Sequence, residues 1–523
     1  MTNLGNRRWM ALGALTLAIL AVGLDATVLS VALPTLANAL HASETDLQWF
    51  SSGYLLVLAA AMLPAGLLGD RYGRKKVLLT SLFLFGIGSV ACAYAPSTVA
   101  FVAARVVLGL AGAGIIVMAL SSLTVLFTEE ERPRAVGIWS AANFLALPLG
   151  PILGGWLLTH YWWGWVFLMN VPVAIVGLIA TFALVPESRA PERPGLDPIG
   201  IIASTSGLVI MTYGLIEAGQ NGWNDARALV PMIAGLIVLI GFFLWERWLS
   251  LRPGGRPMLD LALFHSASFT WGVILAAIAM LAMIGVLFTL PQFFQGVLRT
   301  DAMGSGIRLL PLIIGLVLGS VPADRVARVI GSKFTVALGF VLLSGGMLLG
   351  ATTSIASSNG FIAAWMALVG FGMGLTLATA ASTALSVLPQ ERSGVGAAVM
   401  QAIQKVGAPF GAAILGSVLA SVYQAQLRLV GLPPAVASVV KESLFGGLAV
   451  ALQLGSTQLL YSVRTAFVHG MDVSLVVAAG IAAVGFFLTL VFLPGRATSK
   501  AGGIETVEAT TASAVPADSS TRS

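Results

Sequence analysis

The chain has 523 residues, of which 57% are hydrophobic and 10% are charged. A soluble globular protein carries about 25% charged residues, so this composition excludes a soluble fold and predicts an integral membrane protein. The formal net charge is +6, but the basic residues are scattered between apolar runs, which argues against the basic groove of a nucleic-acid-binding protein.

Long apolar runs recur along the chain. A helix needs about 20 apolar residues to cross a hydrocarbon core roughly 30 Å thick, and the runs predict an all-α protein with fourteen membrane-spanning helices. In chain order these are expected at residues 9–31, 50–69, 77–95, 99–127, 135–160, 166–185, 199–216, 228–245, 269–294, 307–321, 334–353, 361–388, 395–422 and 473–494. The segment 423–471 is moderately apolar and predicts a long extracytoplasmic loop with one or two short helices.

The start of the chain resembles a secretory signal, because Arg7 and Arg8 precede an apolar run. Further spans follow directly, and Asp25-Ala26-Thr27 is a poor cleavage context. The first helix is therefore expected to remain uncleaved.

The distribution of lysine and arginine predicts the orientation of these helices, since cytoplasmic loops carry an excess of both. With fourteen spans, twenty of the 28 basic residues fall on the side of the two termini and six fall on the opposite side. The remaining two, Arg105 and Lys405, lie inside spans. Both termini are predicted to be cytoplasmic. The tail 495–523 is rich in small and polar residues and is expected to be disordered.

Two pairs of similar loops suggest an internal repeat. The pairs are Glu131-Arg132 with Glu391-Arg392, before the fifth and thirteenth spans, and Asp70-Arg71 with Asp324-Arg325, after the second and tenth. Chance is the alternative explanation, because such loops are common in membrane proteins. Two parallel six-helix halves are a transporter architecture. The expected division is residues 1–186, two inserted helices within 187–268, and residues 269–494, which include the loop 423–471.

The loop between the second and third spans reads Gly66-Leu67-Leu68-Gly69-Asp70-Arg71-Tyr72-Gly73-Arg74-Lys75-Lys76. Its glycines permit a tight reversal of the chain, and its acid can accept hydrogen bonds from helix N-terminal amides. This stretch closely resembles the signature loop of the major facilitator superfamily. The positions that carry the resemblance are Gly66, Asp70, Arg71, Gly73 and Arg74.

Other stretches resemble one branch of that superfamily, the fourteen-span drug:proton antiporters of the DHA2 type. They are Leu24 to Pro34 in the first span, Arg105 with Gly109, Gly112 and Gly114 in the fourth, Gly150 to Gly155 in the fifth, Phe167 to Pro172, and Leu290 to Gln295. Ala146 departs from the pattern, because the fifth-helix motif often has a glycine there. The resemblance covers roughly residues 9–494 and implies a transporter of the bacterial inner membrane that is driven by a proton gradient, with no cofactor. No metal site is expected, because the four histidines are far apart in sequence and show no metal-binding spacing.

Two charged residues inside the spans are candidates for proton coupling. A carboxylate deep in a membrane costs roughly 2.5–3.5 kcal/mol on insertion scales, and low dielectric favours its neutral form, so Asp25 is expected to gain and lose a proton. The alternative is that Asp25 only caps or pairs near the outer end of its helix. The resemblance assigns the fourth-helix arginine, Arg105, to the coupling machinery; a static salt bridge or a snorkelling arginine is the alternative. We expect Asp25 and Arg105 to communicate, directly or through water.

Two further sets of residues are candidates for the transport path. Gly150, Pro151, Gly154 and Gly155 predict a tightly packed, bendable fifth helix, which is either a structural kink or a determinant of export direction. Surfaces that mix aromatic and amide groups bind amphiphiles, although an aromatic residue alone is more often lipid-facing or in the core. The candidate cavity residues are Asn143, Gln292, Phe293, Phe294, Gln295, Gln401, Gln404 and Lys405. Unless it is paired, Lys405 would repel cations and favours a neutral or zwitterionic substrate.

The expected function is proton-coupled export of small amphiphilic drugs, antibiotics or dyes by alternating access, carried out by a monomer in the lipid bilayer. Dedicated export of one endogenous metabolite or lipid is the alternative within transport, and a membrane enzyme or a non-transporting sensor is the alternative outside it. No phosphate-binding Gly-x-x-x-x-Gly-Lys-Ser/Thr motif is present. Gly370, Gly372 and Gly374 lie in an apolar span and predict helix packing rather than dinucleotide binding.

Overall fold

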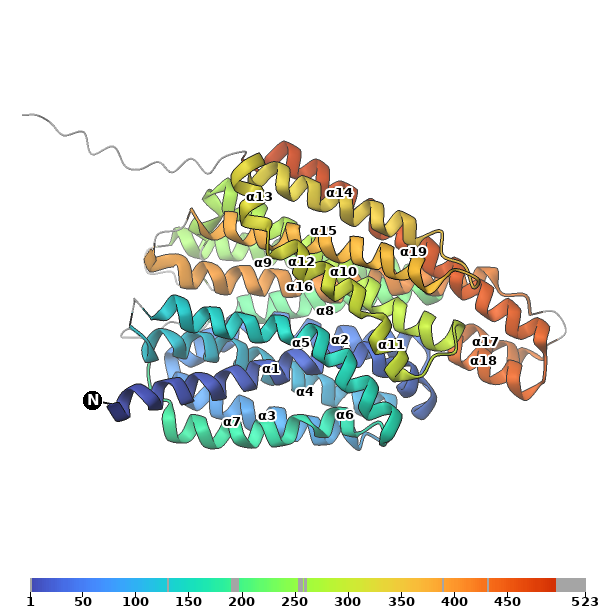
Figure 1. Ribbon diagram of the computed structural model, residues 1–523, viewed down its shortest axis with the longest axis horizontal. Coiled ribbons are helices and arrows are strands. Elements are labelled where there is room, and N and C mark those ends of the chain that lie inside the picture. Colours follow the sequence, from blue (N-terminus) through green and yellow to red (C-terminus); the bar gives the residue numbers. More distant parts are fainter. Residues whose placement is uncertain are drawn as a thin grey trace, which may run out of the picture.

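The computed structural model describes residues 2–128, 131–189, 197–252, 257, 261–387, 390–429 and 432–494 of the chain. All regular secondary structure in these residues is helical, because a helix satisfies its backbone hydrogen-bonding groups internally, as lipid requires. The long helices run roughly side by side along the longest axis of the molecule (Figure 1). The all-α class is confirmed; the predicted tail 495–523 lies outside the described residues.

The number of membrane spans is close to the prediction. Among the described residues, twelve helices are long and apolar enough to cross a membrane, and a thirteenth is added if Glu44–Met62 and Pro64–Tyr72, which meet at a bend of 46°, form one span. α5 (Arg132–His160) coincides with the fifth predicted span, and many of its side chains lie outside the described residues. The exact count of fourteen therefore stays a prediction.

The helices before residue 186 form one packed group, in the lower part of Figure 1. They are α1 (Thr2–Ala39), α2 (Glu44–Tyr72), α3 (Arg74–Ala93), α4 (Thr98–Leu126), α5, α6 (Trp165–Leu168) and α7 (Asn170–Leu184). α1 packs against α5 and α7, and α4 packs against both α2 and α3. Side chains from four helices can therefore meet around α1 and α4.

The helices after residue 260 form a second packed group. They are η1 (Leu261–His265), α10 (Ala267–Gln292), the π-helical turn η2 (Phe293–Val297), α11 (Ala302–Arg308), α12 (Leu310–Ser320), α13 (Ala323–Ile330), α14 (Ser332–Gly350), α15 (Asn359–Leu385), α16 (Gln390–Gln426), α17 (Pro434–Glu442), α18 (Leu444–Gln453) and α19 (Thr457–Phe492). α10 packs against α16 as α1 packs against α5 in the first group, and α15 packs against α12 and α14.

Two helices connect these groups in sequence. α8 (Pro198–Asn221) contacts α2 of the first group and α16 of the second, and α9 (Ala226–Leu251) packs on α8. Ile237 and Leu244 of α9 are 62% and 60% exposed. An apolar outer face of this kind suits contact with lipid rather than water.

The chain between α16 and α19 differs from the expected long loop. It holds two short helices, α17 and α18, as the sequence indicated, but α19 begins at Thr457, well before the predicted start at residue 473. The Ser456 hydroxyl caps α19 by accepting from the Leu459 amide. Tyr423 near the end of α16 ties this region together, because its hydroxyl donates to the carbonyls of Val440 and Ser443 at 2.8 and 3.2 Å.

Small residues bring the helices of the second group into backbone contact. A Cβ atom added at Gly370 or Gly374 of α15 would overlap the carbonyl oxygen of Leu312 or Leu316 of α12. Lipid provides no hydrophobic force that drives helices together, so close packing of this kind stabilises the bundle. The glycines of this span are packing residues, as the sequence predicts.

Candidate proton-coupling site

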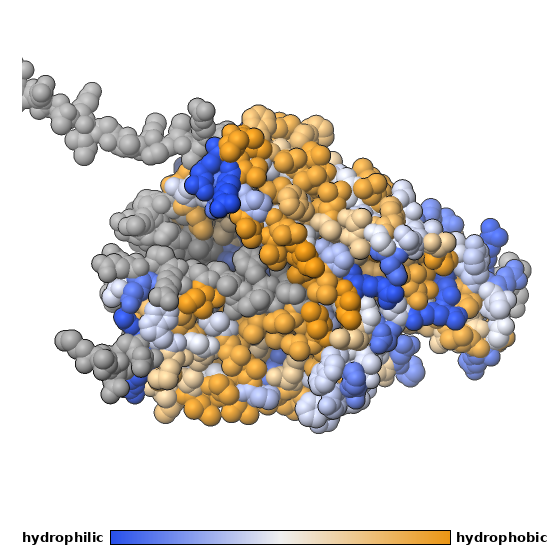
Figure 2. Space-filling model, in the orientation of Figure 1, coloured by the Kyte–Doolittle hydropathy of each residue, from blue (hydrophilic) through white to orange (hydrophobic). Residues whose placement is uncertain are grey.

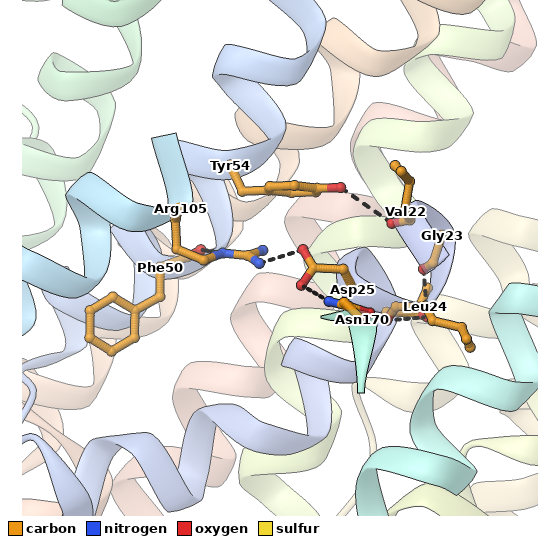
Figure 3. A network of polar contacts seen from close by, with 9 residues as sticks. Val22, Gly23, Leu24, Asp25, Phe50, Tyr54, Arg105 and Asn170 are labelled. Carbon is orange, nitrogen blue, oxygen red and sulfur yellow. Dashed lines mark hydrogen bonds and ion pairs between the residues drawn. The ribbon is translucent and has the colours of Figure 1, made fainter. Parts of the chain in front are cut away.

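A buried ion pair joins α1 to α4. Asp25 and Arg105 are both fully buried, and Nη1 of Arg105 donates to Oδ2 of Asp25 at 2.6 Å (Figure 3). Nδ2 of Asn170, the first residue of α7, donates to the other carboxylate oxygen at 3.1 Å. Asp25 thus contacts Arg105 directly and receives donors from two other helices.

Arg105 has further partners besides Asp25. Its Nε donates to the carbonyl of Phe50 at 3.3 Å, and its guanidinium carbon lies 4.1 Å from the centroid of the Tyr54 ring. The Tyr54 hydroxyl in turn donates to the carbonyl of Val22 at 3.2 Å. A cation over an aromatic face is stabilised by the ring quadrupole. The arginine therefore retains favourable contacts if the charge of Asp25 is neutralised.

Glycines of α4 bring the arginine to the carboxylate. A Cβ atom at Gly109 would lie 2.6 Å from the carbonyl oxygen of Tyr54, and one at Gly112 would contact Val22 and the Tyr54 hydroxyl. Because these positions lack a side chain, α4 can approach both α2 and α1 closely. Arg105 lies one helical turn before Gly109 and so reaches into the space between the three helices.

The fifth-helix motif contacts α1 through two of its glycines. A Cβ atom at Gly150 would overlap the side chain of Thr27, and one at Gly154 would overlap that of Val28. The Thr27 hydroxyl also donates to the carbonyl of Ala146 at 3.0 Å. Gly150 and Gly154 therefore hold α5 against α1 two and three residues beyond Asp25.

The other two residues of this motif contact the second group of helices. A Cβ atom at Gly155 would lie 2.7 Å from the carbonyl oxygen of Ala302, and one at Gly306 would overlap the carbonyl oxygen of Pro151. Ala302 and Gly306 both belong to α11. The motif thus forms a backbone-to-backbone contact between α5 and α11, in which the carbonyl group of Pro151 faces α11.

The loop between α2 and α3 carries a small polar network. Arg74 pairs with Asp70 one turn earlier, with Nη2 at 2.9 Å and Nε at 3.0 Å from Oδ1. The carboxylate at the first turn of α3 is Glu187, whose Oε1 accepts from the Lys75 amide at 3.2 Å. Gly73 joins the helices with φ +119°, a conformation that residues with a side chain rarely adopt. Glu187 therefore occupies the capping position that the sequence suggested for Asp70.

Two other residues of this loop, Gly66 and Arg71, lie against hydrophobic or aromatic side chains. Gly66 faces Val117 of α4, and the guanidinium carbon of Arg71 lies 5.7 Å from the centroid of the Tyr72 ring. Both contacts stabilise the C-terminal end of α2.

An equivalent turn follows α13 in the second group. Arg328 donates to the carbonyl of Asp324 across one turn at 3.3 Å, and Gly331 ends the helix with φ +89°. The four-residue spacing of acid and base thus recurs, and in both places a glycine with positive φ begins the next helix, although Gly331 lies seven residues after its acid and Gly73 only three. This likeness goes beyond the shared Asp-Arg dipeptide that the sequence shows.

The predicted cavity residues of α10 and η2 are packed between helices. Gln292, Phe293 and Phe294 are all fully buried. Nε2 of Gln292 donates to Oε1 of Glu44 at 3.3 Å, and Nε2 of Gln295 donates to the carbonyl of Val31 at 3.0 Å. These residues therefore connect the second group of helices to the start of α2 and to α1.

The predicted cavity residues of α16 lie at a different depth. Pro409, one turn beyond Lys405, accepts a hydrogen bond from Ser52 through its carbonyl. Ser52 and Glu44 are eight residues apart on α2, which corresponds to roughly 12 Å along the helix. Gln401, Gln404 and Lys405 are thus separate from the Gln292 cluster; the side chain of Asn143 lies outside the described residues.

Sequence reasoning missed three residues that contact these sites. Asn170 falls in a stretch that resembles the antiporter branch, so a signal existed, but only the fold brings it to Asp25. Tyr54 is one of many aromatic residues in apolar runs, and nothing in the sequence distinguishes it. Glu44 precedes its predicted span and looks like a loop residue, although it is only 3% exposed.

The amino-acid sequence matches one family model and several named proteins. Residues 15–412 match the family model described as the Major Facilitator Superfamily. The tetracenomycin C resistance and export protein of Streptomyces glaucescens is 31% identical, over 94% of this chain and 92% of the relative. The multidrug efflux pump LfrA of Mycolicibacterium smegmatis is 32% identical over 91% and 95%, and the methyl viologen resistance protein SmvA of Salmonella typhimurium is 30% identical over 92% and 98%.

Solved structures share the fold. An inward-facing, unoccupied bacterial homologue of the human lysosomal transporter Spinster superposes with a TM-score of 0.66 at 16% identity, over 94% of this chain and 98% of that one. A D-xylose–proton symporter superposes with a TM-score of 0.58 at 15% identity, over 93% and 98%. At such low identity these structures establish the architecture alone.

Proposed function

The chain belongs to the Major Facilitator Superfamily of membrane transporters, and we propose that it exports small amphiphilic compounds in exchange for protons by alternating access. The observation that carries this proposal is the buried pair of Asp25 and Arg105. A carboxylate shielded from water and paired between helices changes its interactions when it gains one proton. Relatives that are named as export and efflux proteins support the direction of transport.

A proton on Asp25 can act at a distance through packed helices. Protonation neutralises the carboxylate and weakens its attraction for Arg105. Two residues further along α1, Thr27 contacts α5 at Gly150, and α5 contacts α11 at Gly155. Coupling of this kind needs a continuous chain of contacts with two arrangements. We propose that α1 and α5 transmit the protonation state of Asp25 to the contact between the two groups of helices.

Alternating access requires the two groups to separate at each end in turn. We propose that residues 1–186 and 269–494 are the moving halves and that residues 187–268 are an insertion between them. The halves are joined near the start of α2 by hydrogen bonds of Gln292 with Glu44, Gln295 with Val31, and Ser417 with Gln48. In this proposal these bonds break when the transporter opens to the outside, and the predicted cavity residues then contact substrate.

The proposed setting is the cytoplasmic membrane of a bacterium, since the relatives named above are bacterial. The excess of basic residues on one side of the predicted spans favours cytoplasmic termini. Each proposed half contains its own packed helices, so we propose that the monomer transports substrate without a partner chain.

Flux measurements in inside-out membrane vesicles test this function. With an acidic interior, vesicles that contain the protein are expected to accumulate an uncharged amphiphilic dye. Exchange of one proton for one neutral molecule at a pH difference of one unit supports roughly tenfold accumulation, because one unit corresponds to about 1.4 kcal/mol. The measurement is dye fluorescence before and after an uncoupler collapses the gradient.

Equal dye movement with and without the gradient would reject antiport. The same assay with a panel of dyes and antibiotics separates the two forms of export. Accumulation of several unrelated compounds indicates multidrug efflux, whereas accumulation of one compound indicates a dedicated exporter.

Lys405 is expected to lower the transport of cations. Gly407 and Gly411 of α16 face α10, and the carbonyl of Pro409 contacts Ser52 of α2. Lys405 lies one turn before Pro409, on the side of α16 that is turned away from these glycines and toward the other half. In the part of the chain that the structure describes, Lys405 has no ion-pair partner. We expect Lys405→Gln to increase the accumulation of a monovalent cationic dye about tenfold relative to a neutral one, because repulsion over several ångströms at an effective dielectric near 20 exceeds 1.4 kcal/mol.

The control for this effect is Lys405→Arg, which retains the charge and should keep the wild-type preference. The measurement is the ratio of the two accumulation rates in vesicles. An unchanged ratio in Lys405→Gln would place Lys405 outside the substrate path.

A further inference from the structure

A groove opens between α11 and α15 on the outer surface of the second group of helices. Its volume is about 410 Å³, and Ile307, Pro311 and Ile362 contribute apolar walls while Arg308 and Asn359 contribute polar groups. Figure 2 shows hydrophilic residues in blue among hydrophobic residues in orange over α11. The groove thus combines an apolar surface with a positive charge at one end of the bundle.

Arg308 has no acidic partner among the described residues. The ion pairs there join Arg8 to Glu131, Arg74 to Asp70 and Arg105 to Asp25. Asp301, at the start of the same helix, instead caps α11 by accepting from the Gly304 amide at 2.8 Å. A guanidinium that lines an apolar groove without a counter-charge is suited to an anionic ligand, above all a phosphate that it can hold through two parallel hydrogen bonds.

The position of the groove indicates where that anion comes from. Ala302–Ser320 is long and apolar enough to span a membrane, and Arg308 lies in its first turns, near the level of lipid headgroups. Further along the chain from Arg308, on and just after α12, Ile314, Leu318 and Val321 are 53%, 59% and 75% exposed. This stripe continues along the helix toward the middle of the bilayer, so an acyl chain can follow it while a headgroup stays at Arg308.

We infer that this groove binds an anionic phospholipid, with the phosphate on Arg308 and an acyl chain along the exposed face of α12. The charge of the arginine and the apolar stripe below it are complementary to the two parts of such a lipid. Asn359, at the start of α15, supplies a second polar group beside the phosphate position.

Binding of the lipid would affect the contact between the two groups of helices. Arg308 is two residues from Gly306, whose backbone lies against the carbonyl oxygen of Pro151 on α5. A lipid that holds α11 against α15 therefore favours one position of α11 relative to α5. Binding itself does not depend on the proposed transport function, and it is measured separately.

Native mass spectrometry of the full-length protein in a neutral detergent tests the inference. We expect phosphatidylglycerol to remain bound and Arg308→Gln to weaken its binding about tenfold, since a hydrogen bond to a charged group is typically worth this factor or more. Arg308→Lys should retain part of the affinity as a point charge. Arg227→Gln, which removes an exposed arginine on α9 away from the groove, is the matched control and should bind as the wild type does.

Two further ligands test whether binding needs both the phosphate and the acyl chains of the lipid. Diacylglycerol lacks the phosphate and glycerol 3-phosphate lacks the acyl chains, so both should bind at least tenfold more weakly than phosphatidylglycerol. Equal binding of phosphatidylglycerol by the wild type and Arg308→Gln would overturn the inference, and so would glycerol 3-phosphate binding as tightly as the lipid. Displacement of the lipid by an amphiphilic dye in an Arg308-dependent manner would reassign the groove to substrate.

Discussion

Asp25→Asn is expected to abolish gradient-driven accumulation, from roughly tenfold at one pH unit to no accumulation. The carboxamide is nearly the size of the carboxyl group, but it cannot take up and release a proton at physiological pH. It also removes the charge that Arg105 contacts at 2.6 Å. Downhill movement of dye through the protein should persist, because the variant blocks coupling rather than the path. Dye flux in vesicles with and without a pH gradient measures both quantities.

The stability of this variant needs a separate control. Removing one member of a buried ion pair can cost about 3–5 kcal/mol, because the other charge is left uncompensated. Asp25→Asn/Arg105→Gln removes both charges and should recover much of that stability while still failing to accumulate dye. Asp225→Asn changes a carboxylate that only caps α9, and it should transport normally because asparagine caps as well as aspartate. Full accumulation by Asp25→Asn would remove Asp25 from the mechanism.

Gly306→Val is expected to separate α5 from α11 and to open the closed end of the protein. A Cβ atom at this position would overlap the carbonyl oxygen of Pro151, and a backbone atom cannot move aside as a flexible side chain can. Overpacking typically costs 1–3 kcal/mol, which would shift the balance between closed and open states by roughly a factor of ten. Dye accumulation should fall to a similar degree.

A cysteine reporter measures this opening directly. Cys92 is the single cysteine of the chain and is fully buried, so Gln295→Cys introduces one thiol beside the closed contact with α1. Gly306→Val should increase its labelling rate by a membrane-impermeant maleimide about tenfold. Gly345→Val is the matched control, because an added Cβ there meets no atom within 4 Å. Wild-type labelling and transport in Gly306→Val would mean that this contact does not control access.

The individual members of the candidate site could be found from the sequence, but their neighbours could not. Asp25 and Arg105 are conspicuous because charges are rare in apolar runs, where each needs a partner. Asn170 is 145 residues from Asp25 in the chain. Its side-chain amide reaches Asp25 only because α7 packs on α1. Glu44 lies before the predicted span 50–69, but α2 begins there and Gln292 of the second group of helices contacts it.

The apolar middle of most helices was predictable from the sequence, but the helix ends were not. Hydrophobicity reports the part of a helix that lies in lipid, whereas capping groups and tertiary contacts decide where the helix stops. α1 therefore continues to Ala39, and α19 begins at Thr457, where Ser456 caps it. The predicted spans had ended at residue 31 and begun at residue 473.

Composition and long apolar runs by themselves determined that this protein is a helical bundle in lipid, because helices satisfy every backbone hydrogen bond within one segment. The motifs by themselves also determined the family. Only the tertiary structure decided which residues meet: Asp25 with Arg105 and Asn170, Gly155 with α11, and Gln292 with Glu44. Those contacts join positions from 80 to 248 residues apart, and they depend on how whole helices pack, which no local pattern of residues specifies.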